Sequence, residues 1–405
     1  MKFDVWAPYA HDVKVVVDGV EHPMRRDDAR TGWWLSDIEK VPGQRYGFSL
    51  FDGASWTSPL PDPRSTRQPD GVHGLSAVTD PEFEWSDQHW TNYELKGQVI
   101  YELHVGTFSK EGTFDGVVDK LDYLVDLGVT TIELMPVQPF GGERNWGYDG
   151  VDWFAVQESY GGPDGLKRLV NAAHRRGVGV YLDVVFNHFG PDGNYNGQFG
   201  PYTTSGSTGW GDVVNFSGAD SDEVRAFVLD AVRRWLTEFH IDGLRLDAVH
   251  SYDDRNAYSI MEQINMLADE VEAEFGPNPI IIAESDLNDP RIISDYSVGG
   301  YGLDAQWLDD VHHALHTVVT GENNAYYEDF GTIEILADTL RHGFRFRNHY
   351  SSFRGRTHGR ALDLSTIPPW KLITYTTTHD QVGNRAQGDR PSQNLTLAQH
   401  ALKAA

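Results

Sequence analysis

The chain has 405 residues, of which 40% are hydrophobic and 12% aromatic, and this apolar content predicts a large folded core and excludes a disordered polymer. With 33 basic against 60 acidic residues the net charge is -27, so we expect neither nucleic acid nor an anionic membrane surface as a partner. No cysteine is present, which excludes disulfides and thiolate chemistry. Asp4 interrupts the start where a signal peptide needs an apolar run, so a cytoplasmic protein is expected.

Residues 1–85 are expected to form a small all-β domain. Short β-type runs such as VKVVVD (13–18) and GWWLSDI (32–38) are separated by turn-rich pieces such as VPGQ and FDGAS. This spacing is typical of an immunoglobulin-like sandwich of the kind found in carbohydrate-binding modules. The Pro-, Asp- and Gly-rich segment LPDPRSTRQPDG (60–71) then predicts an ordered connector to a second domain.

Residues 86–405 alternate between strand-like apolar runs and amphipathic helical stretches. The seven predicted strands are VIYELHVG, TTIELMPV, GVYLDVVF, GLRLDAV, PIIIAES, LDAQWLDD and LITYTTTHD. This series predicts an eight-stranded (β/α)8 TIM barrel whose active site lies at the carboxyl ends of the strands, here incomplete after the seventh strand and helix. A doubly wound sheet is the alternative, but no GxGxxG or Walker sequence follows a strand, so the barrel is favoured.

Polar residues follow several of the predicted strands and should converge at one mouth of the barrel. Any one of them could instead be a helix cap or a solvated acid, and the stretch around Arg245 and Asp247, taken alone, favours a structural ion pair over a functional site. The set consists of Asp183, Asn187 and His188 after the third strand, Arg245 and Asp247 on the fourth, Glu284 on the fifth, and His379 and Asp380 after the seventh.

Three separate strands thus deliver a carboxylate, and their surroundings suggest different protonation states. Glu284 ends an apolar strand, where burial should raise its pKa and keep a proton available, whereas Arg245 should keep Asp247 ionised. One protonated and one ionised carboxyl group about 5 Å apart is the requirement for glycosidic cleavage with retention. Asp380 could then stabilise the developing positive charge. No required metal or other cofactor is predicted.

At these positions the sequence closely resembles the α-amylase family of glycoside hydrolases, through the ordered motifs DVVFNH, DGLRLDAVH, IIAES and TTHD. The resemblance implies that Asp247 is the nucleophile, Glu284 the general acid and base, and Asp380 the transition-state stabiliser. It also implies a group of sugar-binding residues: Tyr148 of NWGYDGVD, His188, Arg245, His250 and His379.

Three longer strings, PDPRSTRQPDGVHG, AESDLNDPR and HDQVGNRAQGDR, are similar to one group within that family. Its members cut the α-1,4 bond next to the terminal trehalose of a maltooligosyltrehalose and release trehalose, after a maltooligosyltrehalose synthase has isomerised the reducing end. Asp286 and the segment 348–356 are candidates for recognising the trehalose. A glucan branching enzyme with the same carboxylates is the alternative, and a non-catalytic glucan-binding protein is a rival of another class.

The chain also departs from the family pattern in two places. Thr378 stands before His379 where relatives carry Asn, and the eighth strand with its following β domain is not found. Asn187 occupies a position at which many amylases bind calcium, but the segment 190–211 is short of the acids that would complete an oxygen cage.

Overall fold

The computed structural model describes residues 1–276 and 278–404, and its chain divides into two compact units. The first unit consists of Met1–Tyr93, Gln98–Asp247 and Ser251–Pro279. The second consists of Glu94–Gly97, Ala248–His250 and Ile280–Ala405. Each unit carries a share of the residues that the sequence singles out, so the two are described in turn.

The amino-terminal part of the first unit consists of two antiparallel sheets. One has the order β1-β5-β4 and the other β3-β2-β6-β7. Buried side chains on β1, β2, β5 and β6 face a shared core, in which the rings of Phe3 and Tyr46 are 4.9 Å apart and connect the two sheets. The expected small β domain is therefore present. Its strands are β1 (Lys2–Trp6), β2 (Asp12–Val17), β3 (Val20–Pro23), β4 (Arg25–Arg26), β5 (Trp33–Glu39), β6 (Arg45–Phe51) and β7 (Ser76–Ala77).

The remainder of the first unit contains four parallel strands in the spatial order β8-β9-β10-β13. They are β8 (Ile100–Leu103), β9 (Thr131–Leu134), β10 (Gly179–Val184) and β13 (Gly243–Leu246). The last three are buried along their whole length, as expected for parallel strands covered on both faces. Their helices are α1 (Val105–Phe108), α2 (Phe114–Val118), α3 (Leu121–Leu127), α4 (Gly162–His174), α5 (Asn196–Phe199), α6 (Ser221–Thr237) and α7 (Ile260–Phe275).

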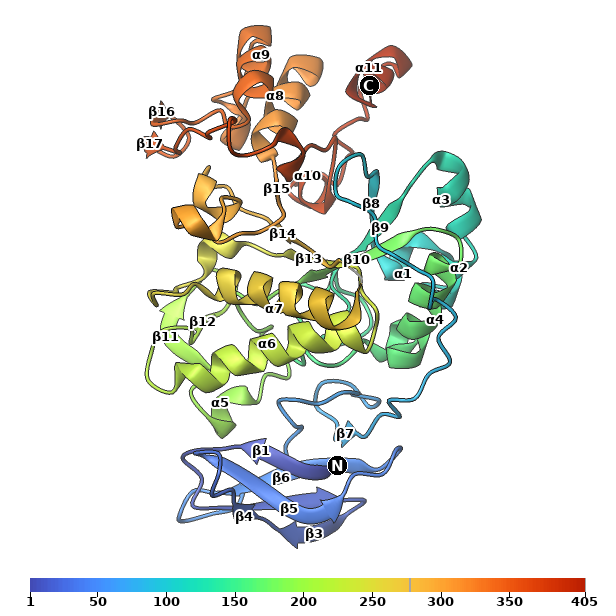
Figure 1. The fold of residues 1–405 in the computed structure, drawn as a ribbon, viewed down its shortest axis with the longest axis vertical. Helices are drawn as coiled ribbons and strands as arrows, with labels where there is room; N and C mark the ends of the chain where they lie inside the picture. Colours follow the sequence, from blue (N-terminus) through green and yellow to red (C-terminus); the bar gives the residue numbers. More distant parts are fainter. Residues whose placement is uncertain (277, 405) are drawn as a thin grey trace. The chain divides into compact units, whose positions relative to one another are not determined.

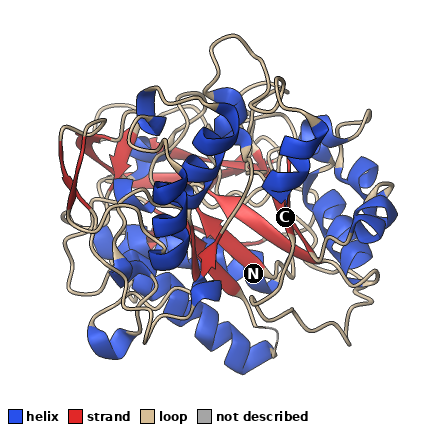
Figure 2. Cartoon of the chain, turned by 90° about the horizontal axis from the view of Figure 1, so that it is seen from above, coloured by secondary structure: helices blue, strands red, loops and turns tan. Residues whose placement is uncertain are grey.

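Helices α6 and α7 lie side by side (Figure 1) and present their apolar faces to the interior. A short antiparallel hairpin, β11 (Thr203–Ser207) and β12 (Asp212–Val214), follows β10. Loops, tan in Figure 2, make up much of the chain between these elements, and 3₁₀ turns interrupt several of them. The 3₁₀ turns are η1 (Glu158–Tyr160), η2 (Val249–Ser251), η3 (Pro290–Ile292), η4 (Tyr296–Val298), η5 (Ala325–Tyr327) and η6 (Pro369–Lys371).

The second unit contains three parallel strands, β14 (Ile280–Ala283), β15 (Ala305–Trp307) and β18 (Leu372–Ile373). Its helices are α8 (Asp309–Thr320), α9 (Ile333–His342), α10 (His379–Gly383) and α11 (Leu397–Ala404). Helices α8 and α9 pack together around Ala314 and Phe330, and an antiparallel hairpin, β16 (His349–Ser351) and β17 (Arg356–His358), follows α9.

All seven predicted parallel strands are present, and they alternate with helices as expected. The seventh, β18, ends at Ile373 and is much shorter than the run LITYTTTHD suggested; Thr378 in the same run is the N-cap of helix α10 and forms a capping box with Gln381. An eighth parallel strand does not occur within residues 1–276 and 278–404. In the same residues, no helix combines the length and the apolar character that crossing a bilayer requires.

Candidate active site

In the first unit, Arg245 lies between two carboxylates at the carboxyl ends of β10 and β13. The register of these parallel strands places Asp183 beside Arg245. The buried guanidinium donates through Nη1 to Asp183 Oδ2 at 2.9 Å and to Asp247 Oδ1 at 2.7 Å. A buried arginine with two such partners is compensated.

Asp247 is held by a different donor at each carboxylate oxygen. Oδ1 accepts from Arg245, and Oδ2 accepts from Asn187 Nδ2 at 2.7 Å. The same Asn187 nitrogen also donates to the Asp247 carbonyl at 3.1 Å. The Asp247 side chain nevertheless remains 15% exposed. The Asp247 carboxylate is therefore held in a fixed orientation and is still accessible to a ligand.

Two neutral polar rings complete this group. The Tyr148 hydroxyl donates to Asp183 Oδ2 at 2.5 Å, and its burial and the Asp183 charge raise the pKa of Tyr148 well above its usual value. Burial lowers the pKa of His188, so its ring is neutral at pH 7, and Asn187 Oδ1 contacts its Nδ1. The exposed Trp210 ring lies beside His188, with 6.3 Å between the ring centroids.

In the second unit, Glu284 follows β14 directly and is fixed by the backbone. Its Oε2 accepts the Ala248 N–H at 2.6 Å, and its carbonyl accepts the Val249 N–H at 3.0 Å. Ala248 has a φ of 42°, which is uncommon for a residue with a side chain. The backbone after β13 thus adopts a strained conformation in which it binds this carboxylate.

Asp309 is a further acid of this group that the sequence interpretation did not single out. Burial, and then the neighbouring Glu284 charge, raise the pKa of Asp309 well above its usual value. The Tyr375 hydroxyl donates to its Oδ1 at 2.8 Å. Asp309 is therefore harder to ionise than an ordinary aspartate. The signal in the sequence was an acidic pair directly after the sixth strand, in LDAQWLDD.

Asp286 joins three separate segments of the second unit. Its Oδ2 is 2.9 Å from Arg354 Nη2, and its carbonyl is 2.7 Å from His358 Nε2. Burial opposes its ionisation, but His250 and Arg354 outweigh that effect and lower the pKa of Asp286. Asp286 and the segment 348–356, both predicted to recognise the trehalose, are thus in direct contact through Arg354.

His379 and Asp380 begin helix α10, and they differ in exposure. The His379 side chain is 7% exposed and Asp380 is 47% exposed, with 3.6 Å between Nε2 and Oδ1. Burial and the neighbouring Asp309 raise the pKa of Tyr375, and the charges of Glu284 and Asp380 add to this effect. Tyr375 therefore lies near both acids, and the second unit gathers Glu284 and Asp380 around it.

The two groups have distinct chemical abilities. The first unit offers a fixed anion with neutral hydroxyl and imidazole groups around it, which suits nucleophilic attack on a neutral polar ligand. The second offers a glutamate beside a buried acid whose pKa is raised, an exposed aspartate and an ion pair. Within the described part of the chain, no three His, Asp or Glu side chains are grouped closely enough to hold a metal ion.

Comparison with known proteins agrees with these observations. Residues 77–207 match the family model of the alpha amylase catalytic domain. The malto-oligosyltrehalose trehalohydrolase of Mycobacterium tuberculosis is 52% identical over 100% of this chain and 70% of its own length. The 1,4-alpha-glucan branching enzyme GlgB of Corynebacterium jeikeium is 31% identical over 75% of this chain and 47% of its own length.

Among solved structures, a putative alpha amylase from Salmonella typhimurium superimposes with a TM-score of 0.87 and 37% sequence identity. The match covers 98% of this chain and 67% of that one. The predicted fold class, a (β/α) barrel preceded by a small β domain, is therefore confirmed. The division at residue 85 stays a prediction.

Proposed function

The chain belongs to the malto-oligosyltrehalose trehalohydrolase family, within the α-amylase group of glycoside hydrolases, and we propose that it hydrolyses the α-1,4-glucosidic bond next to the terminal trehalose of a maltooligosyltrehalose. The observation that carries this proposal is 52% identity over the entire chain to an enzyme of that name. The products would be free trehalose and a shortened maltooligosaccharide.

The proposed mechanism is a double displacement with retention. Glu284 donates a proton to the glycosidic oxygen, and trehalose leaves while Asp247 attacks the anomeric carbon and forms a glycosyl ester. Glu284 then removes a proton from water, which displaces Asp247 and restores both groups. Asp380 would stabilise the positive charge that develops on the sugar ring in each step.

The contacts of Asp247 support its role as the nucleophile. Arg245 and Asn187 each donate to one of its oxygens, so the carboxylate is held in a single orientation. Desolvating most of a carboxylate and fixing it with two donors costs free energy, which a purely structural role would not explain. The structural interpretation of the Arg245–Asp247 pair is therefore the weaker one.

Neutral hydrogen-bonding groups support the proposed contacts to sugar hydroxyls. Tyr148 and His188 would surround the sugar in the first unit, where both are uncharged at neutral pH. His250 and His379 are the proposed ligands from the second unit. In the same unit, Asp286 and Arg354 would bind hydroxyls of the trehalose, because an ion pair offers both acceptors and donors.

The wider cellular setting belongs to the same proposal. A cytoplasmic location fits a chain without cysteine. The substrate must come from an enzyme that isomerises the reducing end of a maltooligosaccharide, and a maltooligosyltrehalose synthase is the proposed pathway partner. No required cofactor is proposed, because the double displacement uses only carboxyl groups and water.

A branching enzyme is the second candidate, because it shares the fold and a detectable sequence relationship. It would transfer the glycosyl group to a sugar hydroxyl instead of to water. Incubation of the protein with maltotriosyltrehalose separates the two, since we expect free trehalose and maltotriose. New α-1,6 branch points on amylose, without trehalose release, would assign the branching activity instead.

We expect Glu284→Gln to lower kcat on maltotriosyltrehalose by roughly 10²- to 10⁴-fold, because the amide cannot donate the proton. Binding of the substrate, measured by calorimetry, should be retained. Glu270→Gln, a change at a surface residue of α7 that pairs with Arg233, is the matched control and should hydrolyse normally. Undiminished hydrolysis by the Glu284 variant would contradict its assignment and would also exclude binding alone as the function.

A further inference from the structure

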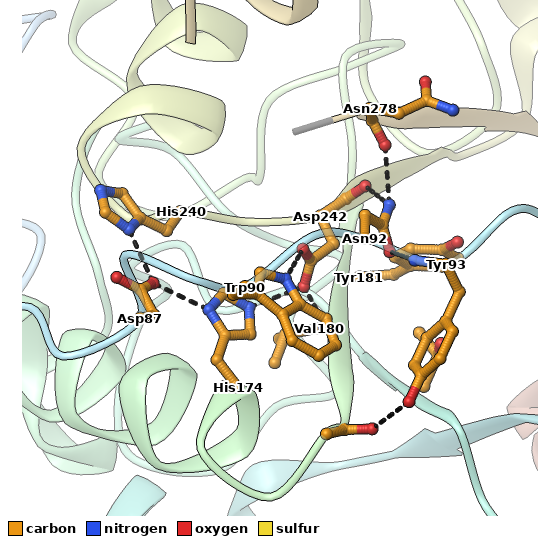
Figure 3. A network of polar contacts seen from close by, with 12 residues as sticks. Asp87, Trp90, Asn92, Tyr93, His174, Val180, Tyr181, His240, Asp242 and Asn278 are labelled. Carbon is orange, nitrogen blue, oxygen red and sulfur yellow. Dashed lines mark hydrogen bonds and ion pairs between the residues drawn. The ribbon is translucent and has the colours of Figure 1, made fainter. Parts of the chain in front are cut away.

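A second cluster of charged residues lies in the first unit, at the opposite ends of β10 and β13 from Asp183 and Asp247. It joins residues 85–93, the segment that precedes β8, to the last residue of α4 and to the starts of both strands (Figure 3). Its members are Asp87, Trp90, His174, His240 and Asp242, and none of them takes part in the proposed reaction.

His174 is the centre of this cluster. Its Nδ1 is 2.8 Å from Asp87 Oδ2 and its Nε2 is 2.8 Å from Asp242 Oδ2. A neutral imidazole has one N–H and one lone pair, so it can donate to only one of two carboxylates. With both acids ionised, the geometry requires a doubly protonated, positively charged ring, and this ring is only 1% exposed.

The two acids are bound on all sides. Asp242 also accepts the Trp90 Nε1–H at 2.7 Å and the Val180 N–H at 2.7 Å. Asp87 also lies 2.9 Å from His240 Nδ1. The Trp90 ring stacks on His174, with 4.6 Å between centroids and 10° between planes. The charged groups that face His174 are therefore Asp87 and Asp242, with His240 behind Asp87.

Apolar packing of the segment is incomplete. A pocket of about 430 Å³ borders Trp85 and Trp90 on the segment and Leu236, Val271 and Phe275 on helices α6 and α7. Because this space leaves the two indoles without full contact to the helices, the attachment depends on the polar contacts more than a filled interface would.

We propose that His174 is a latch that is positively charged at neutral pH and fastens residues 85–93 to the amino ends of β10 and β13, and that its deprotonation at higher pH releases this segment. The protonated His174 ring donates to both Asp87 and Asp242, whereas the neutral ring can donate to only one of them. A neutral His174 would leave one buried acid with a missing donor, and the segment would open so that water could hydrate that acid.

The direction of the pH effect follows from the contacts. Burial alone would lower the pKa of His174, but hydrogen bonds and charges of Asp242 and Asp87 outweigh it and raise the pKa to about 9. Because this pKa lies above the ordinary value of about 6.5, the stabilisation is complete below about pH 6.5 and is lost as the pH rises through about 9. Asp87, whose pKa is lowered, would lose its contribution only in acid.

Hydrogen exchange tests the proposal on the protein as it stands. After correction for intrinsic exchange, the protection of amides in residues 85–93 should fall on the order of 100-fold between about pH 6.5 and about pH 9.5. His174→Gln, which has one donating end, should show low protection at both pH values. The control His89→Gln, a change at an exposed histidine of the same segment, should behave as the unmodified protein.

Nitrogen NMR of the His174 ring gives a second measurement that needs no variant. The proposal expects both ring nitrogens protonated at about pH 7.5 and a transition near pH 9. A neutral ring at about pH 7.5, or protection that does not change with pH in the unmodified protein, would overturn it.

Discussion

At the scale of single residues, one guanidinium helps to orient the proposed nucleophile, Asp247. Arg245 binds Asp183 and Asp247 together, while Asp183 also accepts the Tyr148 hydroxyl. Two carboxylates share one cation, so the environment stays electronegative where positive charge would develop on a sugar ring. Asp183 contacts both Arg245 and Tyr148, so we expect it to orient these two side chains.

We expect Arg245→Met to lower the free energy of unfolding by about 3–5 kcal/mol, because it leaves Asp183 buried without a positive partner. Activity should fall with it, since Asp247 loses one of its two orienting donors. Urea denaturation measures the first effect. Arg255→Met removes a pair with Asp253 on the exposed surface and should leave the unfolding midpoint unchanged. Equal midpoints for both variants would show that the buried pair contributes nothing.

At the scale of elements, the loop after β9 positions Tyr148 through an unusual backbone. Gly147 has a φ of 101°, and a Cβ atom there would collide with the Pro136 carbonyl. Gly142, in the same loop, has a φ of 78° but open space around its Cα. Only the first glycine is required both for its conformation and for the close approach of two backbone segments.

Gly142→Ala should cost about 1–2 kcal/mol of unfolding free energy, the penalty of a left-handed conformation with a side chain. Gly147→Ala should cost more, because the loop must also move away from Pro136. That movement carries Tyr148 away from Asp183, so we expect kcat/KM to fall for this variant alone. Thermal unfolding and steady-state kinetics on both proteins test the pair. Unchanged kcat/KM in Gly147→Ala would mean that the loop does not set the Tyr148 position.

At the scale of the whole molecule, charge is the dominant feature. A net charge of -27 implies mutual repulsion among surface carboxylates in the folded state, which salt screens. We expect the melting temperature to rise between about 0.01 M and about 1 M NaCl, as the Debye length falls from about 30 Å to about 3 Å. A melting temperature that falls with added chloride would show that specific ion pairs outweigh the net repulsion.

Much of this protein could be predicted from its sequence because local patterns encode it. The seven parallel strands follow from short apolar runs bounded by polar turns, and a strand end is also where DVVFNH, DGLRLDAVH and IIAES place their polar residues. The resemblance to the α-amylase family rests on the same motifs. The roles of Asp247, Glu284 and Asp380 stay predictions, carried by the resemblance and tested by substitution.

Other features depend on contacts between distant segments, and only the tertiary structure decided them. Burial raises the pKa of Asp309, but the letters LDD do not reveal which acid is enclosed with Glu284. The partner of Asp286 is Arg354, 68 positions later, and His174 finds its carboxylates 87 and 68 positions away. Protonation depends on the dielectric and the charges within a few ångströms, and those neighbours exist only once the chain has folded.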